Sequence, residues 1–347
     1  MNPSLSNHLD PDRWVKPTAP GAHEWWYFDA ISDDGRDSLV VVWYSALPFD
    51  PEYGLASLRH IQNPVKHSKP DPLNHCAIGF SWYRDGKTVA YALNRFRKDQ
   101  FSHQIDPQSG LNLSIHKNIL TRTNDGSYKL VVDTPALSVG PGSKPIKAEL
   151  SFKPASITDG WEKDLGTADH PHLWILAAPD CQVSGEIQVG KKNLSFQGRG
   201  YHDHNAGGDE LSRSFHKWHW GRFHQGTTTK IYYICEPSPG LSEGLWLECD
   251  QGKVTQTEIL ERLDGTDPKR TVFGIRYQDQ LHHEGSQTKW KLGKPVDQGP
   301  FYLRWVGQMH SLEGEHGRGI CELLQADHLH QRWFNWMIPY RLKQPKI

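Results

Sequence analysis

Short runs of β-branched and aromatic residues are spread along most of the chain. Glycine, aspartate, asparagine or proline interrupts them about every 8–12 residues, a spacing typical of antiparallel sheets. Between the first two runs, the dipeptide Asp34-Gly35 is a standard hairpin signal. The pattern therefore predicts an all-β chain. The plainest runs predict strands at 25–31, 38–45, 77–83, 87–93, 128–133, 174–178 and 230–235.

Helical periodicity is nearly absent. Only 301–312 and 328–337 fit a spacing of about 3.6 residues, and their aromatic content favours strands at least as well. The segment 46–75 carries five prolines and shows no sustained alternation, so we interpret it as a long loop that leaves a sheet. Apolar side chains within it, including Phe49 and Tyr53, predict a lid or entrance over an apolar cavity.

An internal echo indicates two related β-domains. Residues 24–29 (EWWYFD) resemble residues 217–223 (KWHWGRF), and each segment is typical of an aromatic-rich strand. Chance similarity among tryptophan-containing strands is the alternative. Polar stretches at 154–171 and 206–214 are candidate connections. The two expected domains are 20–210, which includes the long loop, and 211–343.

The composition is that of a soluble globular protein with a polar surface. Of 347 residues, 36% are apolar and 23% are charged, which excludes a multi-span membrane protein, a collagen-like chain and a disordered chain. The net charge of −1 provides no basic field that would collect nucleic acid. The 14 tryptophans are a large excess and indicate that the protein encloses something wide, apolar or cationic.

The cysteines and the N-terminus bear on the cellular compartment. Five widely spaced cysteines predict neither a disulfide framework nor a zinc knuckle, and they fit a reducing compartment. Residues 1–21 contain proline and aspartate where a signal peptide would carry an apolar region, and no run of about 18 apolar residues occurs. We therefore expect a cytoplasmic protein whose contact with a membrane, if it makes one, is peripheral.

The densest polar cluster is the run GRGYHDHNAGG. Strand alternation sends Tyr201, Asp203 and Asn205 to one face. His202 and His204 then point to the other face. If the histidines point inward, they form a common ligand pair for zinc, iron or copper. If Tyr201 and Asp203 point inward, an acid lies beside a phenol, which suits proton transfer.

Signals for other chemistries are weaker. His216, His219 and His224 lack a recognised metal-ligand spacing, so we expect no metal. The chain has no glycine-rich phosphate loop, dinucleotide fingerprint or serine-nucleophile elbow, so we expect neither a nucleotide cofactor nor serine-hydrolase chemistry. His172 and Trp174 share one face at the start of a strand, an arrangement that is ordinary core when taken alone.

Motifs along nearly the whole chain resemble the carotenoid 1,2-hydratase (hydroxyneurosporene synthase) family. Its relatives include lipocalin-like cyclases and pericyclases of natural-product pathways. The resemblance implies two lipocalin-like antiparallel β-barrel or sandwich domains packed together. The matching segments, in order, are WWYFDA (25–30) with SDDGR (32–36), PFDPEY (48–53), DPLNHCA (71–77), YHDHNAG (201–207), FHKWHW (215–220) and WMIPYR (336–341).

The resemblance also implies the catalytic residues. In the hydratases a His-x-Trp pair and a later Tyr-x-Asp pair are implicated in catalysis, and the matching residues here are His172, Trp174, Tyr201 and Asp203. We expect Asp203 to be the acid and Trp174 to face the cation, with His172 and Tyr201 orienting the acid or the water. The segment 43–48 (WYSALP) is bulkier and more polar than in carotenoid hydratases, which makes a shorter isoprenoid or polyene a candidate substrate.

The expected function is acid-catalysed hydration, or cyclisation, of an isoprenoid or polyene double bond through a tertiary carbocation, without a cofactor. Such chemistry needs a neutral buried acid, an aromatic face for the cation and an apolar pocket. The alternatives are a pericyclase and a non-catalytic carrier of lipophiles, and a carrier needs no carboxyl beside an aromatic wall. The further aromatic residues expected to line the pocket are Trp26, Phe28, Phe49, Tyr53, Trp218 and Trp220.

Overall fold

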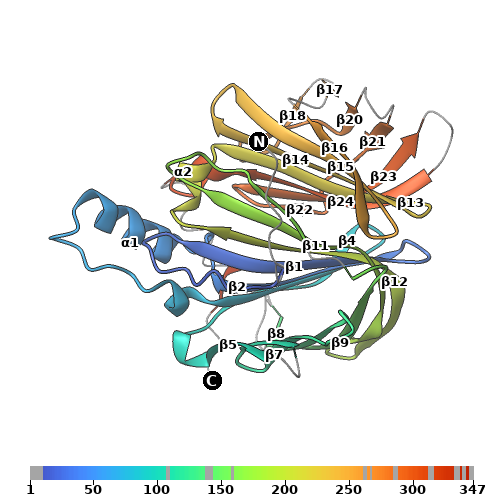
Figure 1. The fold of residues 1–347 in the computed structure, drawn as a ribbon, viewed down its shortest axis with the longest axis horizontal. Coiled ribbons are helices and arrows are strands. Elements are labelled where there is room, and N and C mark those ends of the chain that lie inside the picture. The colour runs from blue at the N-terminus through green and yellow to red at the C-terminus, as the bar shows by residue number, and fades with distance from the viewer. Residues whose placement is uncertain are drawn as a thin grey trace.

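Nearly every regular element of the protein is a β-strand (Figure 1). All seven strands predicted from the sequence are present, and the hairpin at Asp34-Gly35 joins the first two. The all-β prediction is therefore confirmed. The computed structural model describes residues 11–106, 110–136, 144–157, 160–260, 264–265, 268–283, 288–311, 316–331, 337 and 341–343.

The first half of the chain forms one antiparallel sheet, with the strand order β4-β3-β2-β1-β12-β11-β9-β8-β7-β6-β5 and with β10 paired to β11. Its strands are β1 (His23–Ser32), β2 (Asp37–Ala46), β3 (Ala77–Arg84), β4 (Lys87–Arg95), β5 (Phe101–Asp106), β6 (Gly110–Ile115), β7 (Asn118–Arg122), β8 (Tyr128–Pro135), β9 (Pro145–Pro154), β10 (Trp161–Asp164), β11 (His172–Val189) and β12 (Lys192–Gly207).

The second half forms another antiparallel sheet, with the order β16-β15-β14-β13-β24-β23-β21-β20-β17 and with β22 paired to β23. Its strands are β13 (Lys217–Gln225), β14 (Thr228–Ser238), β15 (Leu241–Asp250), β16 (Lys253–Ile259), β17 (Asp264–Gly265), β20 (Gln280–His283), β21 (Thr288–Lys291), β22 (Asp297–Gln298), β23 (Tyr302–Ser311) and β24 (His316–Gln325). The short strands β18 (Lys269–Arg270) and β19 (Arg276–Tyr277) pair with each other.

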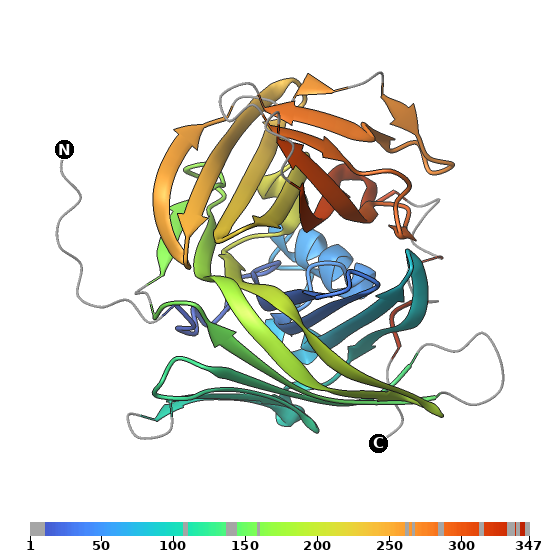
Figure 2. The ribbon, with the colours of Figure 1, turned by 90° about the vertical axis from the view of Figure 1, so that its right-hand side faces the viewer.

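The two sheets repeat one topology. In each, the first strand lies between the second strand and the last long strand, so β1 and β13 occupy equivalent positions. The two echoing segments, 24–29 and 217–223, lie in these two strands. Both sheets curl into half-barrels that pack together (Figure 2), as expected of a two-domain lipocalin-like fold. The boundary predicted at 210/211 lies between the sheets, beside α2 (Leu211–Ser214), and independent folding of each half stays a prediction.

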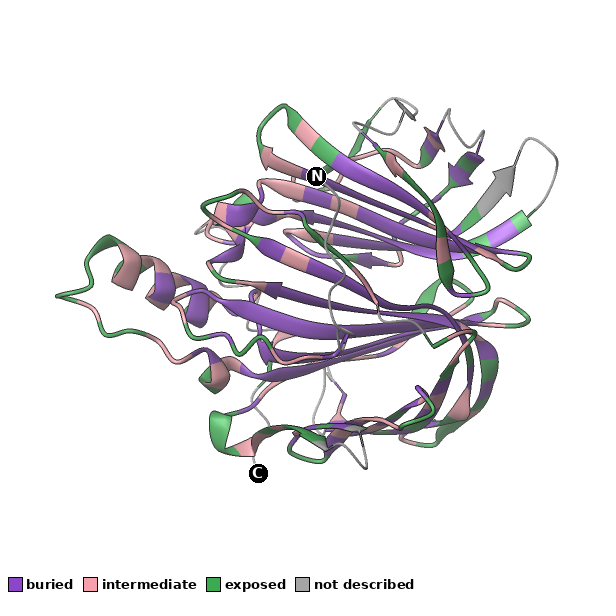
Figure 3. Cartoon of the chain, viewed as in Figure 1, coloured by how far each residue is buried: buried purple, intermediate pink, exposed green. Residues whose placement is uncertain are grey.

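The central strands of the first sheet are buried on both faces (Figure 3). Along β1, Trp26 and Phe28 enter a core formed within the first sheet. Trp25 and Tyr27 point the opposite way, into a core that also contains Trp218, Trp220 and other residues of the second sheet. Because β1 separates two cores, it carries aromatic side chains at consecutive positions and has no polar face.

The interpretation of 46–75 as a loop without regular structure is wrong, because the segment contains helix α1 (Pro51–Gln62). The Asp50 side chain caps this helix by accepting a hydrogen bond from the Glu52 backbone N–H at 3.0 Å, and Pro51 suits the first turn. The buried face of α1 is small and mixed, which weakens the periodic signal in the sequence. A 3-10 turn, Pro72–His75, then leads into β3.

Other expectations are resolved by the strand assignments. Residues 302–311 form β23, so the strand interpretation of 301–312 is confirmed. Most of 328–337 lies outside the described residues. The stretch 154–171 contains β10, which pairs with β11 of the same sheet, so it is no boundary between the sheets. All five cysteines are buried and unpaired. No helix in the described part of the chain is long and apolar enough to cross a membrane.

Candidate active site

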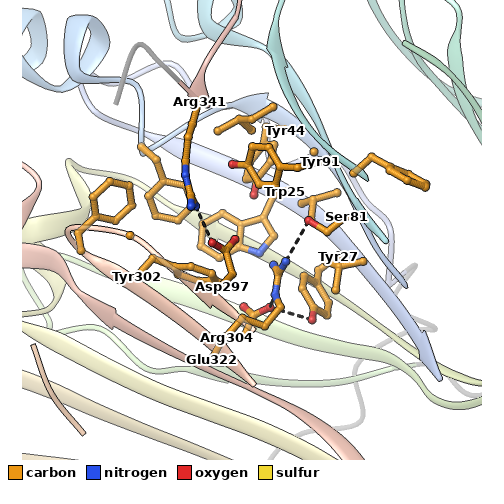
Figure 4. Close-up of a pocket in the computed structure, with 18 of the residues that line it drawn as sticks. Trp25, Tyr27, Tyr44, Ser81, Tyr91, Asp297, Tyr302, Arg304, Glu322 and Arg341 are labelled. Carbon is orange, nitrogen blue, oxygen red and sulfur yellow. Dashed lines mark hydrogen bonds and ion pairs between the residues drawn. The ribbon is translucent and has the colours of Figure 1, made fainter. Parts of the chain in front are cut away.

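A cavity of about 320 Å³ lies between the two sheets (Figure 4). Side chains from β1, β2, β3, β4 and β12 form one side, and side chains from β13, β14, β23 and β24 form the other. Its aromatic walls include Trp25, Tyr44, Phe49, Trp218, Trp220 and Tyr233. Its polar side chains include Tyr27, Ser81, Asp203, Asn205, Asp297, Arg304, Glu322 and Arg341.

The register of three adjacent strands assembles the reactive face of the first sheet. Directly opposed residues of antiparallel strands project from the same face, so β1, β12 and β11 together present a small grid of side chains. Read from β1 through β12 to β11, the rows of this grid are His23, Gly207 and His172; Trp25, Asn205 and Trp174; and Tyr27, Asp203 and Leu176.

The Asp203 carboxyl is held by three side chains of β11 and β12. Its Oδ2 accepts hydrogen bonds from the Tyr201 hydroxyl at 2.7 Å and from Trp174 Nε1 at 2.9 Å. Its Oδ1 lies 2.9 Å from Asn205 Nδ2. Burial raises the pKa of Asp203 to about 7, although the bonds from Tyr201 and Trp174 act in the opposite direction. The site therefore contains a carboxyl that can exchange a proton near neutral pH.

Trp174 and Tyr201 support the carboxyl from behind. Both are fully buried, and neither belongs to the cavity wall. The Trp174 ring packs edge-on against Trp161 at 5.6 Å and tilted against Tyr233 at 5.2 Å. Burial raises the pKa of Tyr201 well above its usual value, so its hydroxyl remains a donor. The Trp174 ring, which was expected to face a cation, therefore does not line this cavity, whereas Trp25, Trp218 and Trp220 do.

His172 lies in the row of the grid next to that of Trp174 and Asn205. Its Nε2 is 3.2 Å from Asn205 Oδ1, and its Nδ1 is 3.2 Å from His23 Nε2. Burial lowers the pKa of His172 well below its usual value, so the imidazole is neutral. His172 therefore reaches the Asp203 carboxyl through one intervening side chain, that of Asn205, and its role in orienting the acid stays a prediction.

The structure shows which face of β12 meets the cavity. His202 Nε2 bonds to Asp12 Oδ1 at 2.9 Å, and its ring stacks on Phe28 at 3.8 Å. His204 Nε2 bonds to Glu24 Oε1 at 3.0 Å. Both histidines point away from the cavity, whereas Asp203 faces it. Across the described residues, no group of three or more histidine, cysteine or acidic side chains is arranged to hold a metal.

A second polar cluster lines the cavity opposite the first sheet's carboxyl. Glu322 Oε1 accepts hydrogen bonds from the Tyr27 hydroxyl at 2.9 Å and from Arg304 Nε at 2.8 Å. Arg304 also donates to the Tyr83 hydroxyl at 2.9 Å. It donates to Ser81 Oγ at 3.2 Å (Figure 4). These residues come from β1, β3, β23 and β24, so the cluster ties the two sheets together.

The outer end of the cavity combines aromatic and charged side chains. The rings of Phe49 and Phe301 stack at 5.7 Å and connect the segment before α1 to the start of β23. Arg341 donates to Asp297 Oδ1 at 2.6 Å, and its guanidinium lies 5.4 Å from the centre of the Tyr91 ring (Figure 4). Since 42% of the Arg341 side chain is exposed, this pair lies where the cavity meets solvent.

The structure brings together only some of the residues expected to line the pocket. Phe49, Trp218 and Trp220 line it. Trp26 and Phe28 lie on the opposite face of β1, inside the first sheet's core. Tyr53 lies on the buried face of α1, and its hydroxyl donates to the Ala22 carbonyl at 2.7 Å. It does not line the cavity.

Sequence reasoning missed several residues of the cavity. Trp25 and Tyr27 alternate with Trp26 and Phe28, and the period of two on β1 already shows that only one of these pairs can face a given cavity. Arg304 and Glu322 carry no local signal. They become neighbours of Tyr27 only because β23 and β24 pair and then pack against β1.

Comparisons with known proteins show which family and which fold this chain resembles. The model of the family described as carotenoid hydratase CrtC matches residues 65–346. Hydroxyneurosporene dehydrogenase of Chlorobaculum tepidum is 27% identical over 95% of this chain and 89% of its own length. Acyclic carotenoid 1,2-hydratase of Thiocapsa roseopersicina is 28% identical over 93% of this chain and 73% of its own. Among solved structures, a Nitrosomonas europaea protein named AttH covers 92% of this chain with a TM-score of 0.60 and 14% identity, a similarity of fold alone.

Proposed function

The chain belongs to the carotenoid hydratase CrtC family, and on that premise we propose that it adds water to a carbon–carbon double bond of a polyene. The observation that carries the proposal is the Asp203 carboxyl, which is buried, held by three side chains and directed at an aromatic cavity. With a pKa raised to about 7 by burial, this carboxyl is a neutral acid over the pH range in which an ordinary aspartate has lost its proton.

The proposed reaction begins with proton transfer from Asp203. The proton adds to the hydrogen-bearing carbon of a trisubstituted terminal double bond, and the electron pair of that bond forms the new C–H bond. A tertiary carbocation remains on the adjacent carbon. A water oxygen then bonds to this carbon, and the water returns one proton to the Asp203 carboxylate. The product is a tertiary alcohol, the acid is regenerated, and no electrons are exchanged with a cofactor.

The aromatic walls suit the cationic intermediate. Trp25 and Trp218 lie 6.0 Å apart between ring centres, and Trp220 packs against Tyr27 at 5.4 Å, so indole rings line the cavity from both sheets. Attraction between a cation and an aromatic face in a desolvated site is worth about 2 kcal/mol. We assign this role to the indoles of the wall, while Trp174 holds the acid through its N–H.

The cluster around Glu322 suits the water. Three hydrogen-bonded polar side chains line the cavity here. Glu322 and Arg304 belong to the second sheet, and Tyr27 belongs to the first sheet, which also carries Asp203. Glu322 Oε1 accepts from Tyr27 and Arg304, and a carboxylate carries about four acceptor positions, so Glu322 has capacity left for a water. A water bound there lies in the same cavity as Asp203, so it can reach the cation and return its proton to the carboxylate.

The size of the cavity bears on the substrate. A volume of about 320 Å³ lies at the lower end of the range of about 300–1,000 Å³ that is typical of small-molecule pockets. We propose that one end of a polyene enters the cavity and that the remainder extends outward past Phe49 and Phe301. An acyclic carotenoid and a shorter isoprenoid with the same end group then both fit, because only the terminal unit reaches Asp203.

Product analysis tests the proposal. The purified protein is incubated in ¹⁸O-labelled water with an acyclic carotenoid that has a trisubstituted terminal double bond. The products are separated, and their masses are measured by mass spectrometry. We expect a product heavier by one labelled water. Asp203→Asn should lower its rate by a factor of about 100 or more, the usual contribution of a general acid. Asp180→Asn is the matched control, since Asp180 pairs with Arg199 away from the cavity.

Other products would overturn the proposal. An isomer of unchanged mass would indicate a cyclase or pericyclase. A product lighter by two hydrogens would indicate a dehydrogenase, as the name of the Chlorobaculum tepidum relative specifies for that protein. Binding of the polyene without any product would indicate a carrier. Retention of activity within about threefold in Asp203→Asn would remove Asp203 as the acid.

A further inference from the structure

His23 on β1 extends the hydrogen-bonded chain that begins at Asp203. The chain runs from Asp203 Oδ1 to the Asn205 amide at 2.9 Å, from that amide to His172 Nε2 at 3.2 Å, and from His172 Nδ1 to His23 Nε2 at 3.2 Å. It ends at the Asp209 carbonyl, 3.0 Å from His23 Nδ1. All four side chains are buried, and His23 and His172 lie outside the cavity wall.

The sheet is built to let the two imidazoles meet. His23 and His172 are both cross-strand partners of Gly207, one on each side of β12. A Cβ at residue 207 would lie 2.4 Å from the His23 ring, closer than atoms can approach. The absence of a side chain at Gly207 therefore leaves the space in which the His23 ring reaches His172.

Backbone carbonyls fix the proton of His23. His23 Nδ1 lies 3.0 Å from the Asp209 carbonyl oxygen and 3.3 Å from the Gly21 carbonyl oxygen. A carbonyl can only accept a hydrogen bond, so Nδ1 carries the hydrogen. Burial lowers the pKa of His23, so the ring is neutral and its Nε2 is an acceptor.

The direction of the remaining bonds follows from that proton. Because His23 Nε2 accepts, His172 Nδ1 must donate to it, and the neutral His172 ring is left with an acceptor at Nε2. That acceptor faces the Asn205 amide and requires its NH₂ group. The two ends of an amide have the same shape, and their partners decide which is oxygen. The amide oxygen of Asn205 then faces Asp203 Oδ1, which must carry a hydrogen to bond with it.

We infer that His23, acting through His172 and Asn205, holds Asp203 in its carboxylic acid form, with the acid hydrogen on Oδ1 donated to the Asn205 side-chain oxygen. The inference rests on the proposed function for its purpose and deepens it by naming His23 and Asn205 as positioning residues for the acid. The opposite direction of the chain would put a proton on both nitrogens of His23 and leave Asp203 ionised.

Other groups also act on the two ends of the chain. Glu322 on β24 and Asp29 on β1 are like charges that favour a neutral Asp203, and Tyr233 on β14 faces the carboxyl. The donors Tyr201 and Trp174 favour the ionised form. At the other end, the groups near the imidazoles are the carboxyls of Asp209 and Glu210 and the Asp164 carboxyl, which accepts from the His172 backbone. An experiment must therefore isolate the contribution of His23.

The first test measures the tautomers of the unmodified protein. In ¹⁵N-labelled protein without substrate, proton–nitrogen couplings of the histidine rings show which nitrogen carries the hydrogen. We expect Nδ1–H on both His23 and His172 at neutral pH. Nε2–H on His172, or a doubly protonated His23, would overturn the inference. This measurement needs no variant and no activity, so its outcome is separate from that of the proposed function.

The second test changes His23. Glutamine can either donate or accept a hydrogen bond, so in His23→Gln the hydrogen bonds can run in either direction. Asn205 can then donate to an ionised Asp203. Infrared titration of the ligand-free protein, with Asp203→Asn to assign the carboxyl band, should show the Asp203 midpoint shifted downward by about one pH unit. His219→Gln is the control, because His219 is a half-buried imidazole that bonds to Tyr232 and not to this hydrogen-bonded chain. An unchanged midpoint in folded His23→Gln would contradict the inference.

Discussion

Trp174 Nε1 lies 2.9 Å from Oδ2 of Asp203, so the indole meets the carboxyl through its N–H. The same oxygen accepts the Tyr201 hydroxyl at 2.7 Å. Two donors on one oxygen fix the plane of the carboxyl and direct the other oxygen along β12 toward Asn205. The His-x-Trp and Tyr-x-Asp pairs thus form one hydrogen-bonded unit built on two adjacent strands, in which a single carboxyl faces the cavity.

Replacing the indole tests this relationship. Trp174→Phe keeps an aromatic ring but removes a donor that favours the ionised carboxyl, so the pKa of Asp203 should rise. Because the reaction needs the protonated acid, the decline of kcat at high pH should move to higher pH, while kcat on the low-pH plateau falls several-fold as the carboxyl loses its orientation. Trp161→Phe changes a ring that packs against Trp174 and should leave the pH profile in place. A lower melting temperature with an unaltered profile would indicate that Trp174 only packs.

The raised pKa of Asp203 predicts a pH-dependent cost in stability. Between its ordinary value of 3.8 and its folded value of about 7, the folded protein keeps a proton that the unfolded chain has lost, so stability falls as pH rises through this window. Asp203→Asn retains the shape of the neutral acid and has no such proton. By urea unfolding it should exceed the parent in stability at about pH 7.5 by on the order of a few kcal/mol, with the difference shrinking toward pH 4. A difference that does not change with pH would contradict the assignment.

The role of Phe49 at the cavity entrance predicts a separation of KM from kcat. Phe49→Ala removes one ring of the stacked pair with Phe301, so the polyene should bind more weakly and KM should rise several-fold at a nearly constant kcat. Tyr53→Phe is the contrasting variant, because Tyr53 bonds to the Ala22 carbonyl and does not line the cavity. It should lower the free energy of unfolding by about 1 kcal/mol and leave KM alone. An unchanged KM in folded Phe49→Ala would remove the entrance from the mechanism.

Removal of metal ions should leave turnover unchanged. Both ring nitrogens of His202 have partners, the Tyr27 carbonyl at 2.9 Å and the Asp12 carboxyl at 2.9 Å. His204 is held in the same way by the Pro11 carbonyl and the Glu24 carboxyl, each at 3.0 Å. All four ring nitrogens therefore already have partners, in β1 or in the segment that precedes it. The measurement is turnover before and after dialysis against a strong chelator, and loss restored by zinc or iron would make these histidines ligands.

Much of the fold could be predicted from local sequence. The alternation of apolar residues and the regular turn signals identified the strands, because a half-buried strand needs side chains of period two and a tight turn needs residues such as Asp34-Gly35. Helix α1 escaped because only Tyr53, Gly54 and Ser57 of its residues are buried, and such a face has little apolar contrast. The Asp50 cap stabilises the start of this helix without adding an apolar residue to its buried face, so the periodic signal in the sequence stays weak.

For the site, the sequence established that Tyr201, Asp203 and Asn205 share one face of a strand and that His202 and His204 share the other. It did not determine which face meets the cavity, because β12 and β1 are buried on both sides and period two is the same for either choice. Only the packing of the second sheet decided this. The second sheet places Trp218, Trp220, Arg304 and Glu322 around the same cavity as Asp203. The energy gained by burying these side chains depends on contacts between residues that are far apart in the sequence and become adjacent only in the folded protein.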